Sequence, residues 1–196
     1  KSDGTLGAWQ TLTVLPTIRT GHGITVYNGY LFLIGGHNGS VSFSTVYSAP
    51  VKGDGTIGSW TSLTSTIPAL RSNGAVVQYN GYVFVVGGSA NTGVTGNNTI
   101  YSAPMNSDGT LGGWLTLTTL PASMRYLQAV TYNGYLYVPG GHDGTSATST
   151  VYSAKIEANG TIGSFATLTN MPTILRSHTA VVFNGYMITM AGLDTS

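Results

Sequence analysis

The sequence predicts an all-β fold built from repeated, four-stranded antiparallel units. The first observation is a short phrase that occurs four times, beginning at positions 3, 54, 108 and 159, so that successive copies lie 51, 54 and 51 residues apart. The second is that short apolar runs alternate with turn dipeptides, as expected for strands and hairpins. The third is that no segment has helical periodicity. Together these observations indicate an array of equivalent β-units.

Further markers share this period and place the elements within each unit. Asn-Gly dipeptides begin at positions 28, 80, 133 and 184, and Tyr-Ser-Ala begins at 47, 101 and 152. Gly-Gly occurs at 35–36, 87–88 and 140–141, and becomes Ala-Gly at 191–192. Because several independent markers share one period, the repeat is a specific signal.

The first complete unit illustrates the expected strands. The segment GITVYNGYLFLIGG (23–36) consists of two apolar runs joined by Asn-Gly, which favours a type I′ hairpin turn. TVYSAPV (45–51) is the third strand and GSWTSL (58–63) is the fourth, with Asp-Gly at 54–55 in the turn between them. Pro50 and its counterpart Pro104 are expected at a strand end or a bulge.

A meander of about 50 residues cannot bury both of its faces alone, and radial stacking of several copies solves this problem. The sequence therefore predicts a β-propeller of four-stranded antiparallel blades with about four repeats. Complete blades are expected at 19–64, 71–118 and 125–168, and a partial blade at 176–196 with an N-terminal strand at 7–12. Such an array leaves open faces, so we expect either further blades of a larger parent chain or self-association of identical chains to close the ring.

The markers resemble the kelch repeat. The stretch RTGHGITVYNGYLFLIGG, followed by STVYSAPV and GSW, has the kelch order of apolar run, hairpin turn, Gly-Gly, spaced Tyr and spaced Trp. The resemblance covers essentially the whole chain. It departs from the common kelch pattern in a longer hairpin between the third and fourth strands and in having fewer blades than a full ring. It implies a kelch-like propeller, of the kind found in bacterial secreted proteins.

The composition narrows the class of partner. Only 7% of the residues are charged, the net charge is +1 and there is no cysteine among the 196 residues. Nucleic-acid binding, membrane insertion, thiolate metal sites and disulfides are therefore not expected. We expect no cofactor and no metal, an extracellular or cell-surface location, and a protein or glycan as ligand.

The four arginines of the chain, each just before a first strand, are candidate ligand-binding residues. First strands line the channel of a propeller, so a ring of guanidinium groups could face an acidic or sugar-like ligand. The alternative is that each arginine binds neighbouring backbone carbonyls and joins the blades, which recurrence in every blade favours. The four residues are Arg19, Arg71, Arg125 and Arg176.

The loops after Gly-Gly supply the other candidates, because they differ among copies while the scaffold repeats. They read HNGSVSFS (37–44), SANTGVTGNN (89–98) and HDGTSATS (142–149). Variable loops on a rigid scaffold are common binding positions. The candidates are His37, Asn38, Asn91, His142 and Asp143. A metal shared between the histidines is not expected, because equivalent positions lie on different blades.

Three functions remain open. The first is a non-catalytic binding or scaffold module, and the second is a structural repeat of an extracellular adhesin or fibre. The third is a carbohydrate-active enzyme, since the resemblance extends to families with sialidase-like and sialate mutarotase activities. The chain has only six acidic residues, three of them in the repeated hairpin phrase, so paired carboxylates for glycosidic chemistry are scarce. Non-catalytic binding is therefore the principal expectation.

Overall fold

The computed structural model describes residues 4–92 and 95–194, which form antiparallel sheets and turns with no helix. Three sheets have four strands in sequential order and one sheet has two. The strands are β1 Gly23–Tyr27, β2 Tyr30–Ile34, β3 Val46–Pro50, β4 Thr61–Ser62, β5 Ala75–Tyr79, β6 Tyr82–Val86, β7 Ile100–Pro104, β8 Leu115–Thr116, β9 Val130–Tyr132, β10 Tyr135–Pro139, β11 Val151–Lys155, β12 Ala166–Thr167, β13 Thr179–Phe183 and β14 Tyr186–Met190.

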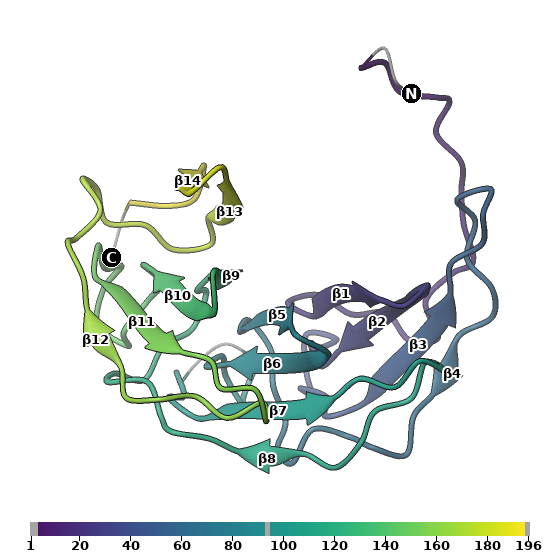
Figure 1. The fold of residues 1–196 in the computed structure, drawn as a ribbon, viewed down its shortest axis with the longest axis horizontal. Coiled ribbons are helices and arrows are strands. Elements are labelled where there is room, and N and C mark those ends of the chain that lie inside the picture. Colours follow the sequence, from purple (N-terminus) through teal and green to yellow (C-terminus); the bar gives the residue numbers. More distant parts are fainter. Residues whose placement is uncertain (1–3, 93–94, 195–196) are drawn as a thin grey trace.

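The sheets are blades arranged in an arc. Figure 1 shows β1, β5, β9 and β13 on the inner side of the arc, with β4, β8 and β12 on the outer side. The first strands of successive blades contact one another, from β1 to β5, from β5 to β9 and from β9 to β13. The predicted all-β architecture of four-stranded antiparallel blades is therefore confirmed.

The inner hairpin of each blade is fixed by its Asn-Gly turn. In the first blade Asn28 has φ 44° and Gly29 has φ 78°, so both central residues adopt the positive φ of a type I′ turn. The register follows, with Tyr27 opposite Tyr30 and Gly23 opposite Ile34. The turn therefore determines which side chains of the two strands face each neighbouring blade.

The recurring phrase of the sequence forms the outer hairpin between the third and fourth strands. The Asp54 carboxylate accepts hydrogen bonds from the backbone amide of Thr56 at 2.9 Å and from its hydroxyl at 2.7 Å. Asn159 accepts the same two bonds from Thr161, at 3.1 and 2.7 Å. Asn replaces Asp here because the turn requires an acceptor oxygen rather than a charge. The first copy of the phrase begins at Asp3, outside the described residues.

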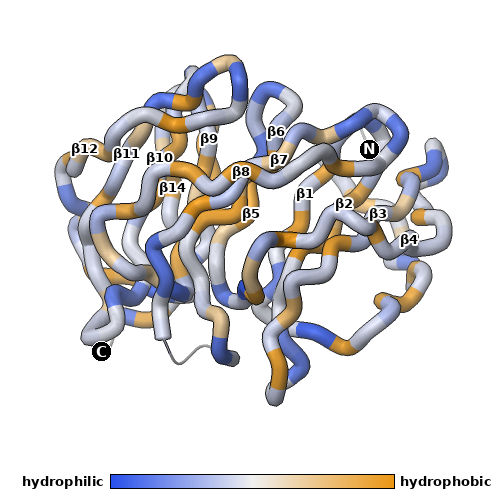
Figure 2. The backbone as a smooth tube through the Cα atoms, turned by 90° about the horizontal axis from the view of Figure 1, so that it is seen from below, coloured by the Kyte–Doolittle hydropathy of each residue, from blue (hydrophilic) through white to orange (hydrophobic). Residues whose placement is uncertain are grey.

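The hydrophobic core lies between blades. One cluster joins Phe32 and Ile34 of the first blade to Val83 and Val85 of the second. A second cluster joins the second blade to the third, with Phe84 and Leu136 both fully buried. Figure 2 shows hydrophobic segments along the strands and hydrophilic segments in the connecting loops. Each blade thus depends on its neighbour to cover its apolar face.

The predicted N-terminal strand at 7–12 is not formed. These residues have no strand pairing in the structure, and the Trp9 side chain is 91% exposed. Figure 1 shows this segment running away from the first blade. The physical reason is that no third strand lies beside β14 in the described part of the chain, so residues 7–12 have no edge with which to pair. Among the described residues there is also no apolar helix long enough to cross a membrane.

Candidate binding site on the loop face

One face of the arc brings the chain segments before each first strand beside the loops after Gly-Gly. Antiparallel bridges connect Thr20 with His37, Ser72 with Ser89, Arg125 with His142, and Arg176 with Leu193. We call the surface formed by these paired segments the loop face. Each of the nine candidate residues lies within two positions of one of these bridged residues.

A line of backbone hydrogen bonds crosses the loop face from blade to blade. The amide of Asn73 donates to the carbonyl of Gly21 at 2.8 Å, Tyr126 to Asn73 at 2.7 Å, and Ser177 to Tyr126 at 2.8 Å. All four residues have positive φ, between 52° and 59°. They line a cavity of about 300 Å³, together with His22 and other residues. The inner edge of the loop face is therefore a regular polar rim around a small cavity.

The four arginines occupy two different positions in the repeat. Arg19 and Arg71 precede the first glycine of Gly-Gly by 16 residues, from 19 to 35 and from 71 to 87. Arg125 and Arg176 precede the equivalent positions, 140 and 191, by only 15 residues. The structure shows the same shift. Arg125 and Arg176 form the bridges that Thr20 and Ser72 form in the first two blades. The residues equivalent to Arg19 and Arg71 are Met124 and Leu175.

Arg19 and Arg71 are buried structural residues. The Arg19 guanidinium, 8% exposed, donates to the carbonyl of Gly35 at 2.8 Å and to the hydroxyl of Thr45 at 3.3 Å. The Arg71 side chain, 4% exposed, donates to the carbonyl of Leu70 at 2.8 Å and to the Tyr101 hydroxyl at 3.3 Å. Burial lowers the pKa of both groups, which still remain cationic at neutral pH.

These guanidinium groups join strands of their own blade rather than different blades. Arg19 lies over the ring of Tyr47, with its Cζ 4.9 Å from the ring centroid, and Arg71 lies 5.1 Å from that of Tyr101. The contact between blades is made instead by the main chain, because the amide of Gly36 donates to the Arg71 carbonyl at 2.7 Å. Arg19 and Arg71 thus have a structural role, as the alternative interpretation expected, but they join strands within a blade rather than neighbouring blades.

Arg125 and Arg176 gather around Tyr126. Their Cζ atoms lie 5.4 and 6.0 Å from the centroid of the same ring, although the two arginines belong to different blades. All three side chains are half-buried, so each keeps an accessible surface. We call these three residues the Arg-Tyr-Arg cluster. It is an aromatic platform flanked by two cations, an arrangement suited to carboxylates and other planar anions.

Tyr126 is the member of this cluster that the sequence prediction did not include. Its φ of 52° is unusual for a bulky side chain, and the equivalent positions hold Gly21, Asn73 and Ser177. Residues held in such a conformation tend to lie at functional sites. The signal was present in the sequence, because aligning the copies on Gly-Gly rather than on Arg places an aromatic residue where the other copies have small or polar ones.

The predicted loop residues form two equivalent turns. In the first blade His37 Nδ1 accepts from the amide of Gly39 at 3.1 Å, and Asn38 Oδ1 accepts from the amides of Ser40 and Val41 at 3.0 and 2.9 Å. The third blade repeats these bonds with His142 and Asp143. These side chains shape the loops, and their hydrogen bonds explain why a His-Asn/Asp-Gly triplet recurs.

Asn91 lies in the second blade's loop, where the backbone is held differently. Its amide donates to the Ser89 hydroxyl at 3.2 Å, and that hydroxyl donates to its carbonyl at 3.1 Å. The Asn91 residue is exposed on the loop face. The structure therefore does not bring Asn91 into the Arg-Tyr-Arg cluster, which belongs to the third and fourth blades.

His142 links the third blade's loop to the Arg-Tyr-Arg cluster. The pKa of His142 is lowered, mainly by burial and also by the positive charges of Arg125 and Arg176. The negative charge of Asp143 raises it by a smaller amount. The two arginines are thus close enough to His142 to act on its protonation. At neutral pH the positive charge of this region comes from the guanidinium groups.

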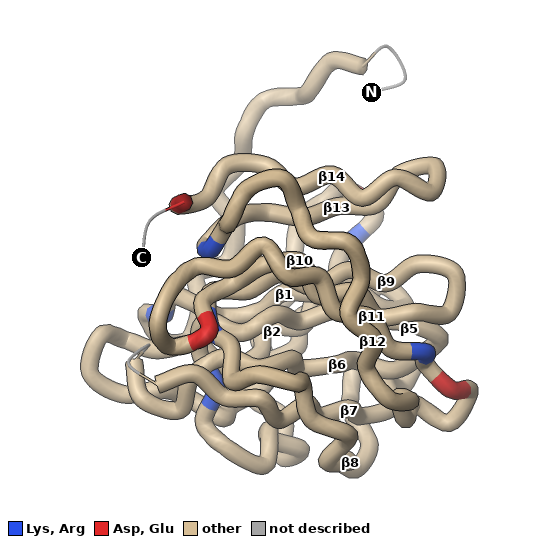
Figure 3. The backbone as a smooth tube through the Cα atoms, turned by 90° about the vertical axis from the view of Figure 1, so that its left-hand side faces the viewer, with Lys and Arg blue, Asp and Glu red and all other residues tan. Residues whose placement is uncertain are grey.

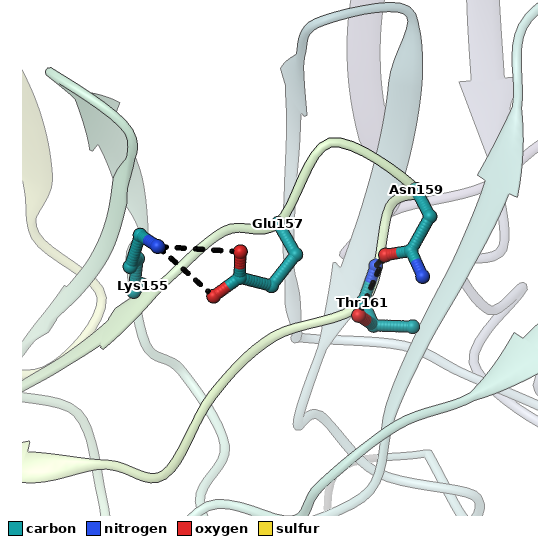
Figure 4. A network of polar contacts seen from close by, with 4 residues as sticks. All are labelled: Lys155, Glu157, Asn159 and Thr161. Atoms are coloured by element: carbon teal, nitrogen blue, oxygen red, sulfur yellow. Dashed lines mark hydrogen bonds and ion pairs between the residues drawn. The ribbon is translucent and has the colours of Figure 1, made fainter.

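The carboxylates of the loop face and the outer hairpins are engaged in local structure. Backbone amides of Ser146 and Thr145 lower the pKa of Asp143, so it stays ionised. In the outer hairpin of the third blade Glu157 pairs with Lys155 at 3.3 Å, as Figure 4 shows beside the Asn159–Thr161 turn. Figure 3 shows that the Lys, Arg, Asp and Glu positions are few and scattered among the described residues. No group of three or more potential metal ligands occurs in the described ranges.

His22 and His178 are equivalent residues on the inner side of the rim, and both line the cavity. Burial lowers the pKa of each, and the charge of Arg19 contributes to the shift at His22. They belong to different blades, as the sequence predicted. Neither contributes a cation to the loop face at neutral pH.

Comparisons with known proteins agree with this architecture. The family model described as Kelch motif matches residues 18–48. Beta-scruin of Limulus polyphemus is 29% identical over 154 residues, covering 72% of this chain and 16% of its own length. Kelch-like protein terF of Aspergillus terreus is 28% identical over 149 residues, covering 72% of this chain and 30% of its own. The chain therefore spans less than a third of either relative.

A solved structure has the same fold. YjhT superposes with a TM-score of 0.78 at 16% identity, and the match covers 94% of this chain and 62% of that protein. The blades, their Gly-Gly and Asn-Gly markers and this match define the chain as an array of propeller blades. More particularly, residues 18–48 match the kelch motif, and most of the chain is similar to part of a kelch-like protein.

Proposed function

We propose that this chain is a non-catalytic binding module whose loop face binds a partner protein through an exposed acidic segment. The observation that carries the proposal is the Arg-Tyr-Arg cluster, in which two guanidinium groups from different blades flank one aromatic ring. Charge-assisted hydrogen bonds from arginine to carboxylate are among the strongest polar contacts that proteins make.

The asymmetry of the array supports this proposal. Arg19 and Arg71 are buried within their blades, whereas Arg125 and Arg176 remain half-buried on the loop face. A purely structural arginine would occupy the same position in each copy, and the displacement by one residue in two adjacent blades needs another reason. Binding supplies it, because a site requires groups that converge from neighbouring elements.

A catalytic function has less support. The carboxylates of Asp54, Asp108 and Asp143 accept turn hydrogen bonds that lower their pKa, and Glu157 pairs with Lys155. A general acid at neutral pH needs a raised pKa instead. A glycan carrying a carboxylate could occupy the same cluster, so an acidic sugar is the second ligand to test.

The proposed test is an array of 15-residue peptides rich in Asp and Glu, each matched by a peptide with Asn and Gln at the same places. The chain is expected to bind the acidic members preferentially. The double variant Arg125→Gln/Arg176→Gln should lose at least about tenfold in affinity, since each lost charge-assisted bond contributes on the order of 1.5–3 kcal/mol.

The matched control is Lys52→Gln/Lys155→Gln, which removes the same charge from exposed positions on outer hairpins. It should leave peptide binding within about twofold, because surface charges away from the site act weakly. An equal loss of peptide affinity in both double variants would show that only the net charge matters, and would contradict a specific site. Binding without preference for the acidic peptides would also contradict the proposal. Sialic acid and other acidic sugars, tested in the same competition format, distinguish a glycan ligand.

We further propose that the module works outside the cell, at a surface or in a secreted assembly. The support is compositional: 7% charged residues, no cysteine and a surface rich in Thr, Ser, Asn and Gly. Fractionation of cells that express the parent gene, with an antibody against this chain, tests the location. Recovery with cytosolic proteins would contradict it.

A further inference from the structure

The loop after Gly-Gly in the first blade contains an Asn-Gly pair that lies outside the hairpin turns. Asn38 and Gly39 are exposed, and a Cβ placed on Gly39 meets no atom within 4 Å. The backbone at Gly39 therefore has room to move. In an Asn-Gly pair the glycine amide nitrogen can attack the side-chain carbonyl carbon of the asparagine, because glycine has no side chain to obstruct the approach. The groups around the pair decide whether the fold promotes this reaction.

The nucleophile of this pair is in contact with a base. The amide of Gly39 donates a hydrogen bond to His37 Nδ1 at 3.1 Å. Because Nδ1 accepts this bond, it carries the lone pair of the neutral imidazole, and the ring proton is on Nε2. A general base acts at about this distance from the proton that it removes. His37 is thus placed to accept the amide proton of Gly39.

The electrophile of the pair is in contact with two hydrogen-bond donors. Asn38 Oδ1 accepts from the backbone amide of Ser40 at 3.0 Å and from that of Val41 at 2.9 Å. These bonds polarise the side-chain carbonyl, and they stabilise the negative charge that Oδ1 acquires when its carbon is attacked. Two backbone amides at this distance are a common means of stabilising an oxyanion in proteins. One turn therefore holds both a base and an oxyanion site.

Asn159, in the outer hairpin of the third blade, has the donors without the base. Its Oδ1 accepts from the amide and the hydroxyl of Thr161. The amide of Gly160 donates to the carbonyl of Glu157 at 3.0 Å, and a carbonyl oxygen is too weak a base to remove the amide proton. Gly160 is also buried, and a Cβ placed there would overlap the ring of Tyr82. The chain therefore contains an Asn-Gly pair that serves as an internal comparison.

The third blade shows that a carboxylate fits the turn of the first blade. His142 Nδ1 accepts from the amide of Gly144 at 3.0 Å, and Asp143 Oδ1 accepts from the amides of Thr145 and Ser146 at 2.8 and 3.0 Å. These are the bonds of the first blade's turn, with Asp in place of Asn. The lowered pKa of Asp143 keeps it ionised, and a carboxylate is a poor electrophile. The turn therefore tolerates aspartate, and the aspartate form does not react further in the same way.

We propose that residues 37–41 form a self-modification site, at which Asn38 converts to aspartate and isoaspartate through a succinimide. His37 accepts the amide proton of Gly39 while the amide nitrogen forms a bond to Cγ of Asn38. The bond from Cγ to Nδ2 then breaks, and the imidazolium returns the proton to Nδ2, which leaves as ammonia. Water, which reaches this exposed loop, opens the succinimide at either of its carbonyl carbons. The net reaction consumes water and releases ammonia, and each product carries a carboxylate.

The test follows the conversion of both Asn-Gly pairs in the folded chain at neutral pH. Peptide mass spectrometry detects the replacement of an amide by an acid, and fragmentation assigns it to a residue. Asn38 is expected to convert at least about tenfold faster than Asn159, since general-base catalysis typically contributes about a hundredfold or more. In urea, which unfolds both turns, the two rates should become similar. Equal rates in the folded chain would overturn the proposal, and so would the same preference for Asn38 in urea.

The variant His37→Asn isolates the contribution of the base. Its side-chain oxygen replaces Nδ1 as the acceptor for the Gly39 amide, but it does not take up the proton. Conversion of Asn38 should slow at least about tenfold, while that of Asn159 stays the same. An unchanged rate at Asn38 in the folded variant contradicts the role of His37 and the proposal with it. If the variant does not fold, the comparison of folded and urea-unfolded wild-type chain still decides.

The conversion adds a negative charge to the loop face in the first blade. Because the net charge of the chain is only +1, one further carboxylate brings it to zero, so ion-exchange chromatography separates the converted chain and gives a second measure of the rate. The proposal does not depend on acidic-peptide binding, since the conversion is measured on the chain alone. Its failure would leave the Arg-Tyr-Arg cluster unaffected, because that cluster belongs to the third and fourth blades.

Discussion

Arg71 shows how a displacement by one residue changes the role of a side chain. At its position the guanidinium lies within the blade and binds a carbonyl and the Tyr101 hydroxyl. Arg125, one position later relative to Gly-Gly, reaches Tyr126 on the loop face instead. Successive residues before a strand point in different directions, so the register decides between a structural and a binding role.

Replacement of Arg71 by alanine is expected to destabilise the chain by about 2–3 kcal/mol, because it removes one buried and one part-buried hydrogen bond and the stacking partner of Tyr101. Urea unfolding followed by circular dichroism measures this loss. Lys52→Ala, an exposed control, should stay within about 0.5 kcal/mol. If Arg71→Ala were as stable as this control, the structural role assigned to Arg71 would be wrong.

The outer hairpins predict a pH dependence. Hydrogen bonds from the Thr56 hydroxyl and amide lower the pKa of Asp54 below its ordinary value. A lowered pKa in the folded state stabilises the hairpin above the unfolded-state pKa of about 3.9, and this contribution is lost as pH falls through the folded pKa. The protection of the Thr56 amide, measured as its exchange rate relative to the intrinsic rate at the same pH, should therefore fall on acidification below about pH 4.

Two comparisons test this hairpin prediction. Thr161 should show no such acid step, since its turn acceptor is Asn159, which does not titrate. Asp54→Asn should remove the step at Thr56 while keeping the turn. Acid steps of equal size at Thr56 and Thr161 would show that the effect does not come from the Asp54 carboxylate.

At the scale of elements, Gly-Gly is where a blade meets the next one. Gly88 has φ 89°, and a Cβ there would lie 2.7 Å from the Ser72 carbonyl oxygen and 2.9 Å from the Cα of Gly74. This close approach allows the amide of Gly88 to reach the next blade. The marker therefore recurs because of backbone contact rather than ligand binding.

Gly88→Ala is expected to cost about 3 kcal/mol, from the unfavourable φ together with the close backbone contact. Gly29→Ala is the matched substitution, because its φ of 78° is similar but no atom lies within 4 Å of the new Cβ. It should cost only about 1 kcal/mol. Thermal unfolding of both variants measures the difference. Equal losses would show that conformational strain alone explains the glycine.

The elements were largely predictable from the sequence, because turns and apolar runs are local features. Asn-Gly fixed the inner hairpins, and Pro50 lies at the end of β3 as predicted. The strand at 7–12 was not predictable in this way, since pairing needs a neighbouring edge that local sequence does not describe. The different roles of the four arginines could not be predicted locally. They depend on the position of each arginine relative to Gly-Gly and on the side chains that surround it in the folded blade.

At the scale of the whole molecule, the array combines a repeated scaffold with one irregular site. Apolar clusters join the first blade to the second and the second to the third, and equivalent backbone hydrogen bonds recur from each blade to the next. The Arg-Tyr-Arg cluster breaks this regularity at the third and fourth blades. Such a division leaves the stability of the array almost independent of the residues that contact a ligand.

The most direct test moves the guanidinium of Arg125 back by one position. The variant Met124→Arg/Arg125→Ser gives the third blade the Arg-Ser order of Arg71 and Ser72, with Thr150 and Tyr152 placed like the partners of Arg19. Binding of acidic peptides should fall at least about tenfold. Urea unfolding checks that the variant is folded under the binding conditions, because the new arginine replaces the buried core side chain of Met124 and is expected to lower the free energy of unfolding. Unchanged peptide affinity in the folded variant would contradict the assignment of the binding site.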